Sequence, residues 1–174
     1  DSAGIATVNN GALESRRAIG KLVNLSDLLV HNPLAGKSGI GHTRWATHGT
    51  PSVKNAHPHQ AGDVAVVHNG IIENFVELRA ELNSYKIKHK TDTDTETIAL
   101  MAKHYLSQGL GPTEVVKKTL LKLKGAFALA FLFQGEDDLM IVARQGSPLA
   151  IGHGNGEMYV GSDAIALAHL TNKI

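Results

Sequence analysis

The 174-residue sequence contains no cysteine. This absence excludes disulfide bonds and thiolate metal sites within the segment, and it removes the most obvious nucleophile from its chemistry. An excess of one charge is also lacking, since seventeen basic residues face sixteen acidic ones and the net charge is +1. Non-specific nucleic-acid binding requires a basic footprint. We therefore expect no nucleic-acid partner.

Long apolar runs are absent as well. No stretch approaches the roughly 20 residues that span a bilayer, and the opening Asp1-Ser2-Ala3-Gly4 lacks the basic and apolar regions of a signal peptide. We expect a cytoplasmic protein without a membrane partner. The composition, 43% apolar and 19% charged, is typical of a globular protein. The length suits a single domain, which usually has on the order of 100–200 residues.

Strand patterns occupy both ends of the sequence and helical patterns its middle. The predicted strands are 3–8, 13–19, 38–44, 64–68, 126–133, 139–144, 149–153 and 158–161, with hairpin turns at 9–11 and 154–157. The predicted helices are a short one capped by Ser26 and Asp27, then 71–82, 98–105, 112–125 and the beginning of one at 164–170. A long loop is expected at 45–62. This order favours an α+β domain with antiparallel sheets over a doubly wound parallel one.

An arginine ends the strand predicted at 38–44 and precedes a loop rich in hydrogen-bonding groups. The planar fork of Arg44 could bind a carboxylate through two parallel charge-assisted bonds. The alternative is a structural salt bridge, which is the better interpretation for an isolated arginine.

Two further motifs allow both a structural and a functional interpretation. His68-Asn69-Gly70 is expected where a strand ends and a helix begins, so the Asn69 amide and the Gly70 N–H could form an oxyanion hole or simply a permissive turn. Asp94-Thr95-Glu96 opens a helix, and Asp94 or Thr95 could cap it. Alternatively, Asp94 could receive an ammonium group, which together with Arg44 would define a site for an α-amino acid.

Five histidines lie between His42 and His68, and His57-Pro58-His59 invites a metal-site interpretation. The proline between the two histidines leaves their orientation undefined, and the nearest acidic residues, Asp63 and Glu73, lack ligand-like spacing. We expect neither a metal nor a cofactor. Histidines that hydrogen-bond to loops are the commoner outcome.

Several stretches, in order and at similar intervals, resemble the glutaminase domain of the glutamine–fructose-6-phosphate aminotransferases, which are class II glutamine amidotransferases. The resemblance spans nearly the whole chain. The similar stretches are 1–4, 42–49, 55–59, 66–74, 93–96, 146–149 and 161–163.

The resemblance implies the fold of the N-terminal-nucleophile hydrolases, a four-layer αββα arrangement from which an N-terminal strand and helix would be missing here. It implies that Arg44 binds the α-carboxylate of L-glutamine and Asp94 its α-ammonium group. Asn69 and Gly70 would form the oxyanion hole. Trp45 would belong to a loop that closes over glutamine, and the remaining implied contacts come from Thr47 and His48.

The family's nucleophile is an N-terminal cysteine, which this sequence does not contain. Three explanations stay open: an ordered part of a longer chain, a truncated form, or a natural homologue without activity. The first two are favoured because a dead domain has no evident use for the retained site residues. We therefore expect residues 1–174 to be a glutaminase domain truncated at both ends, inactive alone, without the sugar-phosphate isomerase domain.

In the parent enzyme, the resemblance implies that ammonia from glutamine converts fructose 6-phosphate, bound by the missing second domain, to glucosamine 6-phosphate. A homo-oligomer is implied for this parent. The alternatives are a glutamine-binding sensor module without hydrolysis and the glutaminase domain of another class II amidotransferase.

Overall fold

The first sheet has three antiparallel strands. The computed structural model describes residues 1–47 and 49–174, so His48 lies outside the described residues. β1 (Ser2–Asn9) and β2 (Ala12–Ile19) form a hairpin whose turn residues Asn10 and Gly11 both have positive φ. This is the backbone that a two-residue hairpin turn requires. β3 (Ser38–Arg44) pairs with the other edge of β1, giving the order β2-β1-β3.

The second sheet has four antiparallel strands in the order β4-β5-β6-β7. They are β4 (His59–Ala61), β5 (Val64–Ile72), β6 (Gly125–Phe133) and β7 (Ile141–Gln145). A separate hairpin of β8 (Ala150–His153) and β9 (Met158–Gly161) follows, and the short 3₁₀ helix η1 (Ile165–Leu167) comes after it. The predicted α+β class with antiparallel sheets is therefore confirmed.

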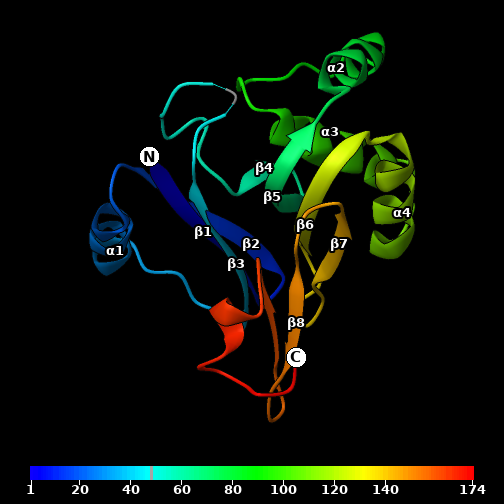
Figure 1. Ribbon diagram of the computed structural model, residues 1–174. Helices are drawn as coiled ribbons and strands as arrows, with labels where there is room; N and C mark the ends of the chain where they lie inside the picture. The colour runs from blue at the N-terminus through cyan, green and yellow to red at the C-terminus, as the bar shows by residue number, and fades with distance from the viewer. Residues whose placement is uncertain (48) are drawn as a thin grey trace.

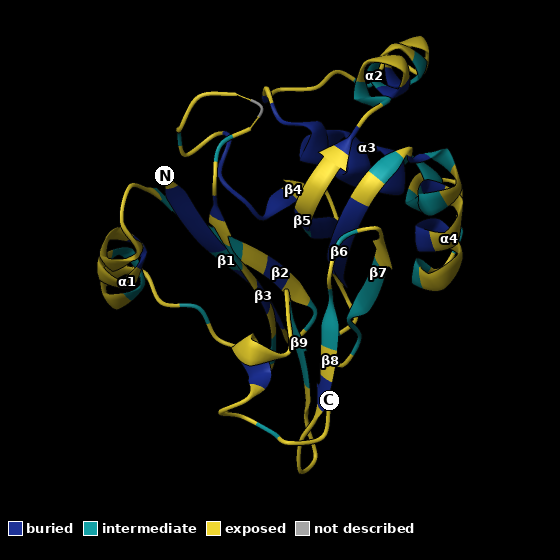
Figure 2. Cartoon of the chain, in the orientation of Figure 1, coloured by how far each residue is buried: buried dark blue, intermediate teal, exposed yellow. Residues whose placement is uncertain are grey.

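Helices lie outside the pair of sheets, as Figure 1 shows. α1 (Leu22–His31) packs against β2 and β1, whereas α3 (Asp94–Ser107) packs against β5 and β4. α2 (Phe75–Ser84) and α4 (Pro112–Lys122) both pack on α3, so that α3 is the most buried of the four helices (Figure 2). Within the described residues, no helix is both long and apolar enough to cross a membrane.

Strand alternation divides the apolar residues of β5 and β6 between two cores. On each strand, every second residue faces α2, α3 and α4, and these residues include Val66, Phe131 and Phe133. The residues between them face the first sheet, where the packed side chains are smaller. This cluster between the sheets consists of Ala6, Val8, Leu13, Ile40, Ala65, Ala130 and Leu132.

The sequence predictions for the start of α1, the end of β5 and residues 164–170 are wrong. α1 begins at Leu22 after Lys21, and the Ser26 hydroxyl donates to the Leu22 carbonyl inside the helix instead of capping it. β5 continues to Ile72, so Ile71 belongs to a strand and not to the following helix. The predicted helix at 164–170 is reduced to one 3₁₀ turn, η1.

Candidate active site

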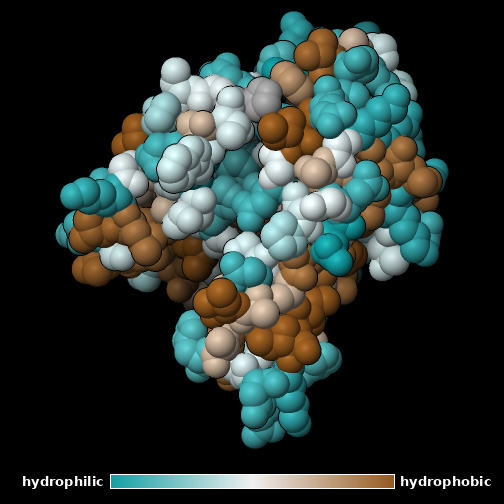
Figure 3. All heavy atoms as spheres, in the orientation of Figure 1, coloured by the Kyte–Doolittle hydropathy of each residue, from teal (hydrophilic) through white to brown (hydrophobic). Residues whose placement is uncertain are grey.

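A cavity of about 400 Å³ opens where β3, β5 and α3 meet. Figure 3 shows hydrophilic residues around a hollow on this face of the molecule. The cavity is lined by every described residue that the sequence singled out for substrate binding or an oxyanion hole: Arg44, Trp45, Thr47, Asn69, Gly70 and Asp94. His48, which was also predicted to contact the substrate, lies outside the described residues.

Arg44 ends β3 on the face that points between the sheets, and its side chain is buried. Its Nη1 donates to the Thr50 carbonyl at 3.3 Å and its Nη2 to the Gly49 carbonyl at 3.0 Å. Burial lowers the pKa of the guanidinium, while the nearby carboxylates of Asp94 and Asp92 act in the opposite direction. Arg44 is thus a buried cation that lines the cavity, and hydrogen bonds to backbone carbonyls hold its guanidinium group in place.

Asn69 and Gly70 lie inside β5, which corrects the prediction that they mark a junction between a strand and a helix. The helix begins at Phe75, after Glu73 and Asn74. Gly70 has a φ of 119°, and a Cβ at this position would lie 2.1 Å from the carbonyl oxygen of Ala126 on β6. Only glycine fits this combination of conformation and contact.

Asp94 is the first residue of α3 and is buried, but it does not cap the helix. The cap is Thr93, whose hydroxyl accepts from the Glu96 N–H. Asp94 Oδ2 instead accepts from the Ile72 N–H at 2.8 Å, which ties α3 to the end of β5. The capping interpretation of Asp94 is therefore wrong, and the carboxylate lines the cavity.

Trp45 and Thr47 are both exposed, and the Trp45 side chain is 90% accessible. They follow β3 in the loop that forms one side of the cavity. The structure thus brings this loop to the predicted site while leaving its large apolar ring in solvent.

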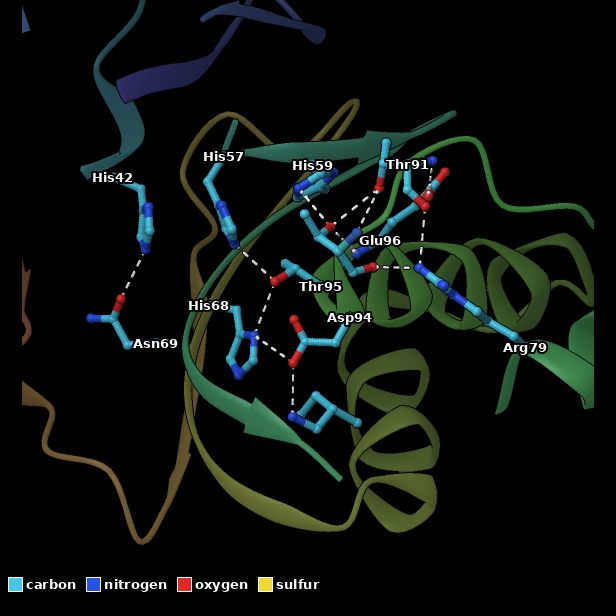
Figure 4. Close-up of polar contacts among 12 residues, drawn as sticks. His42, His57, His59, His68, Asn69, Arg79, Thr91, Asp94, Thr95 and Glu96 are labelled. Carbon is cyan, nitrogen blue, oxygen red and sulfur yellow. Dashed lines mark hydrogen bonds and ion pairs between the residues drawn. The ribbon is translucent and has the colours of Figure 1, made fainter. Parts of the chain in front are cut away.

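Sequence reasoning did not assign a role at the site to four further side chains that line the cavity, His42, His57, His68 and Thr95 (Figure 4). The Thr95 hydroxyl lies 2.8 Å from His57 Nε2 and 3.0 Å from His68 Nδ1. His42 stacks on His57 with a centroid distance of 4.2 Å. Strand parity could have indicated His42, since it follows Ile40 on the same face of β3.

Burial disfavours the charged forms of His57 and His59. Burial lowers the pKa of His57 well below its ordinary value, and neighbouring histidines and Arg44 lower it further. Burial, followed by the charge of Arg17, lowers the pKa of His59 to about 3. Across residues 1–47 and 49–174, no group of three or more His, Asp or Glu side chains is arranged to hold a metal ion.

The sequence matches the family model described as a glutamine amidotransferase domain over residues 42–169. The whole chain is 60% identical to a region of a glutamine–fructose-6-phosphate aminotransferase of Brucella suis and 58% identical to one of Zymomonas mobilis. The chain spans 29% of the length of each of these relatives.

Solved structures of amidotransferases are similar in fold. A glutamine phosphoribosylpyrophosphate amidotransferase from B. subtilis superposes with a TM-score of 0.77 at 28% identity, covering 96% of this chain and 36% of its own. A structure described as the allosteric regulatory enzyme of purine biosynthesis gives a TM-score of 0.82 at 27% identity, covering 96% of this chain and 37% of its own. These neighbours have the N-terminal-nucleophile hydrolase fold. With most of its length matching the family model, the chain belongs to the glutamine amidotransferase domain family.

Proposed function

We propose that residues 1–174 are the glutaminase part of a longer enzyme, which hydrolyses L-glutamine and uses the ammonia to convert fructose 6-phosphate to glucosamine 6-phosphate. The observation that carries the first step is the convergence of Arg44, Asp94, Asn69 and Gly70 on one cavity of about 400 Å³. High identity to aminotransferases named for glutamine and fructose 6-phosphate supports the second. A homo-oligomeric assembly and a cytoplasmic location belong to the same proposal.

In this proposal, the two charged residues hold the α-amino acid end of glutamine. Arg44 binds the α-carboxylate through its guanidinium fork, and Asp94 accepts from the α-ammonium group. Both side chains are buried and line the same cavity, so water competes little for these contacts. Trp45, Thr47 and His48 contribute further contacts from the loop after β3, which closes over the ligand.

The Asn69 side-chain amide and the Gly70 N–H stabilise the negative oxygen that develops when a nucleophile attacks the glutamine amide carbon. The positive φ of Gly70 supports this role, because it turns the backbone out of regular strand geometry at the cavity wall. The nucleophile is a cysteine outside these 174 residues. Its thiol adds to the amide carbon and gives its proton to the amide nitrogen, the C–N bond breaks so that ammonia leaves a thioester, and water then cleaves the thioester to release glutamate and regenerate the thiol.

Glutamate release by the intact protein tests this assignment, and glucosamine 6-phosphate formation tests the acceptor. Asp94→Asn should raise the KM for glutamine about 10- to 100-fold, because it removes one hydrogen-bonded charge pair worth about 1.5–3 kcal/mol. Arg16→Lys, on β2 outside the cavity, is the matched control and should leave the KM unchanged.

A cysteine-alkylating glutamine analogue separates the proposal from its alternative. Labelling of one cysteine in the intact protein, with loss of glutamate release, supports an enzyme. Glutamine binding without labelling or hydrolysis would instead support a sensor module. Glutamate release without glucosamine 6-phosphate formation would assign the chain to another class II amidotransferase.

A further inference from the structure

His42 and Asn69 meet across the space between the two sheets. His42 follows Ile40 on the inner face of β3, and Asn69 follows Val67 on the facing side of β5. His42 Nε2 lies 2.8 Å from Asn69 Oδ1. This contact lies at the polar end of the apolar cluster between the sheets, and both residues line the cavity.

The direction of this hydrogen bond is fixed by chemistry. An amide oxygen can only accept, so His42 Nε2 carries the proton and donates it to Asn69. With Oδ1 engaged, the Nδ2 amino group of Asn69 is turned away from the imidazole. Within the described residues, no hydrogen bond uses Asn69 Nδ2, which leaves its protons available to a ligand.

The orientation of the His42 ring is itself constrained. The ring stacks on His57 at an interplanar angle of 23°, and His57 Nε2 is within 2.8 Å of the Thr95 hydroxyl at the start of α3. Burial lowers the pKa of His42, whereas its hydrogen bond to Asn69 raises it. A chain of contacts therefore runs from α3 through two imidazoles to the Asn69 amide.

We propose that His42 is a positioning residue for glutamine hydrolysis: its Nε2–H holds the Asn69 amide so that Nδ2 points at the developing oxyanion. This inference rests on the proposed function. Arg44 and Asp94 hold the other end of the substrate, so His42 affects the chemical step more than ground-state binding.

Two substitutions of His42 in the intact protein distinguish the effect of its Nε2–H donor from the effect of its aromatic ring. His42→Phe keeps an aromatic ring for stacking on His57 but has no N–H, whereas His42→Gln retains an amide donor at similar reach. For His42→Phe we expect kcat for glutamate release to fall about 10- to 100-fold, since misorientation of a catalytic group has costs of this order. The KM should change less than about twofold, and His42→Gln should restore most of kcat. Rates are expressed per site labelled by the alkylating glutamine analogue, which corrects for misfolded protein.

A double-substitution cycle with Asn69 provides the decisive result. Asn69→Ala should lower kcat about 10²- to 10³-fold, as removal of an oxyanion-hole donor does elsewhere. Adding His42→Phe to Asn69→Ala should cost nothing further, because His42 acts only through Asn69. An equal loss in both backgrounds, or an unchanged kcat in His42→Phe, would overturn the positioning role. If the unsubstituted protein releases no glutamate, the proposed function itself fails, and the role of His42 with it.

Discussion

Gly70 shows how a single residue joins the fold to the site. The residue occupies a central strand, yet its φ of 119° is one that L side chains rarely adopt. A methyl group here would collide with the Ala126 carbonyl of β6, which is part of the sheet and cannot rotate away. The position is therefore closed to every other residue on structural grounds, independently of chemistry.

Gly70→Ala should lower the free energy of unfolding by about 3 kcal/mol or more, because backbone strain of about 1–2 kcal/mol adds to overpacking of about 1–3 kcal/mol. Gly109→Ala is the matched control, since Gly109 also has a positive φ, 85°, but nothing lies within 4 Å of its Cβ position. This variant should lose only the strain. Urea-induced unfolding of the intact proteins, followed by circular dichroism, measures both. Equal losses in the two variants would show that the contact with Ala126 is relaxed.

The helices and strands that were predicted well have a clear spacing of apolar residues and a clear turn or helix-ending signal in the sequence. The hairpin at Asn10-Gly11, the strand β3 and the helix α4 lie where turn residues, alternation and an N-terminal proline indicate them. β4 was missed because three residues are too few to show an alternation of apolar and polar side chains. The strand is defined by its pairing with β5, which depends on the tertiary fold. The end of β5 was misjudged because Ile71 fits both a strand and a helix pattern.

The candidate site was only partly predictable from the residues themselves. Arg44, Asn69 and Asp94 each have an ordinary structural interpretation, and their meeting depends on how β3, β5 and α3 pack. Residue chemistry suggested pairing Arg44 with Asp94, and only the resemblance to a family placed Asn69 in the same predicted site. The His42–Asn69 contact escaped because it joins strands of different sheets, 27 residues apart, which no local pattern specifies.

The junction of β4 with α3 should be sensitive to acid. His59 of β4 contacts the Thr93 cap of α3 through Nε2 at 3.0 Å, and its pKa is lowered from 6.5 to about 3. Between these values the unfolded chain binds a proton that the folded chain does not. The stability that neutral His59 contributes is complete above pH 6.5 and is lost as the pH falls, at up to about 1.4 kcal/mol per pH unit.

His59→Gln should therefore flatten the fall in the free energy of unfolding between pH 6.5 and 4, measured by urea unfolding at a series of pH values. His153→Gln, at an exposed position, controls for the loss of one histidine. A slope for His59→Gln that equals that of the unsubstituted protein would contradict the assignment.

For the whole molecule, the central fact is that the cavity draws its walls from two sheets. Arg44 belongs to the first sheet, whereas Asn69 belongs to the second, and Asp94 is tied to the second through Ile72. The sheets meet through a cluster that contains three alanines, Ala6, Ala65 and Ala130. The separation of Arg44 from Asn69 therefore depends on how closely these small side chains let the sheets approach.

Ala65→Leu should force the sheets apart or strain them, at a cost of about 1–3 kcal/mol. If that cost falls on the site, the KM for glutamine should rise about tenfold, since 1.4 kcal/mol corresponds to a factor of ten. Ala12→Leu, at an exposed position of β2, is the control and should leave the KM unchanged. Steady-state glutaminase kinetics of the intact proteins provides the comparison, and an unaltered KM in Ala65→Leu would show that the cavity is insulated from the sheet spacing.

The small side chains of Ala6, Ala65 and Ala130 thus help to set the distance between the two sheets. Under the proposed function, the first sheet carries the cation for the α-carboxylate and the second carries the donors for the side-chain amide, so the distance between the sheets should set the length of amino acid that fits. Asparagine is one methylene shorter than glutamine, and under the proposed function it should therefore be a poorer substrate. Selectivity for the length of the amino acid would then depend on apolar residues that lie outside the cavity lining.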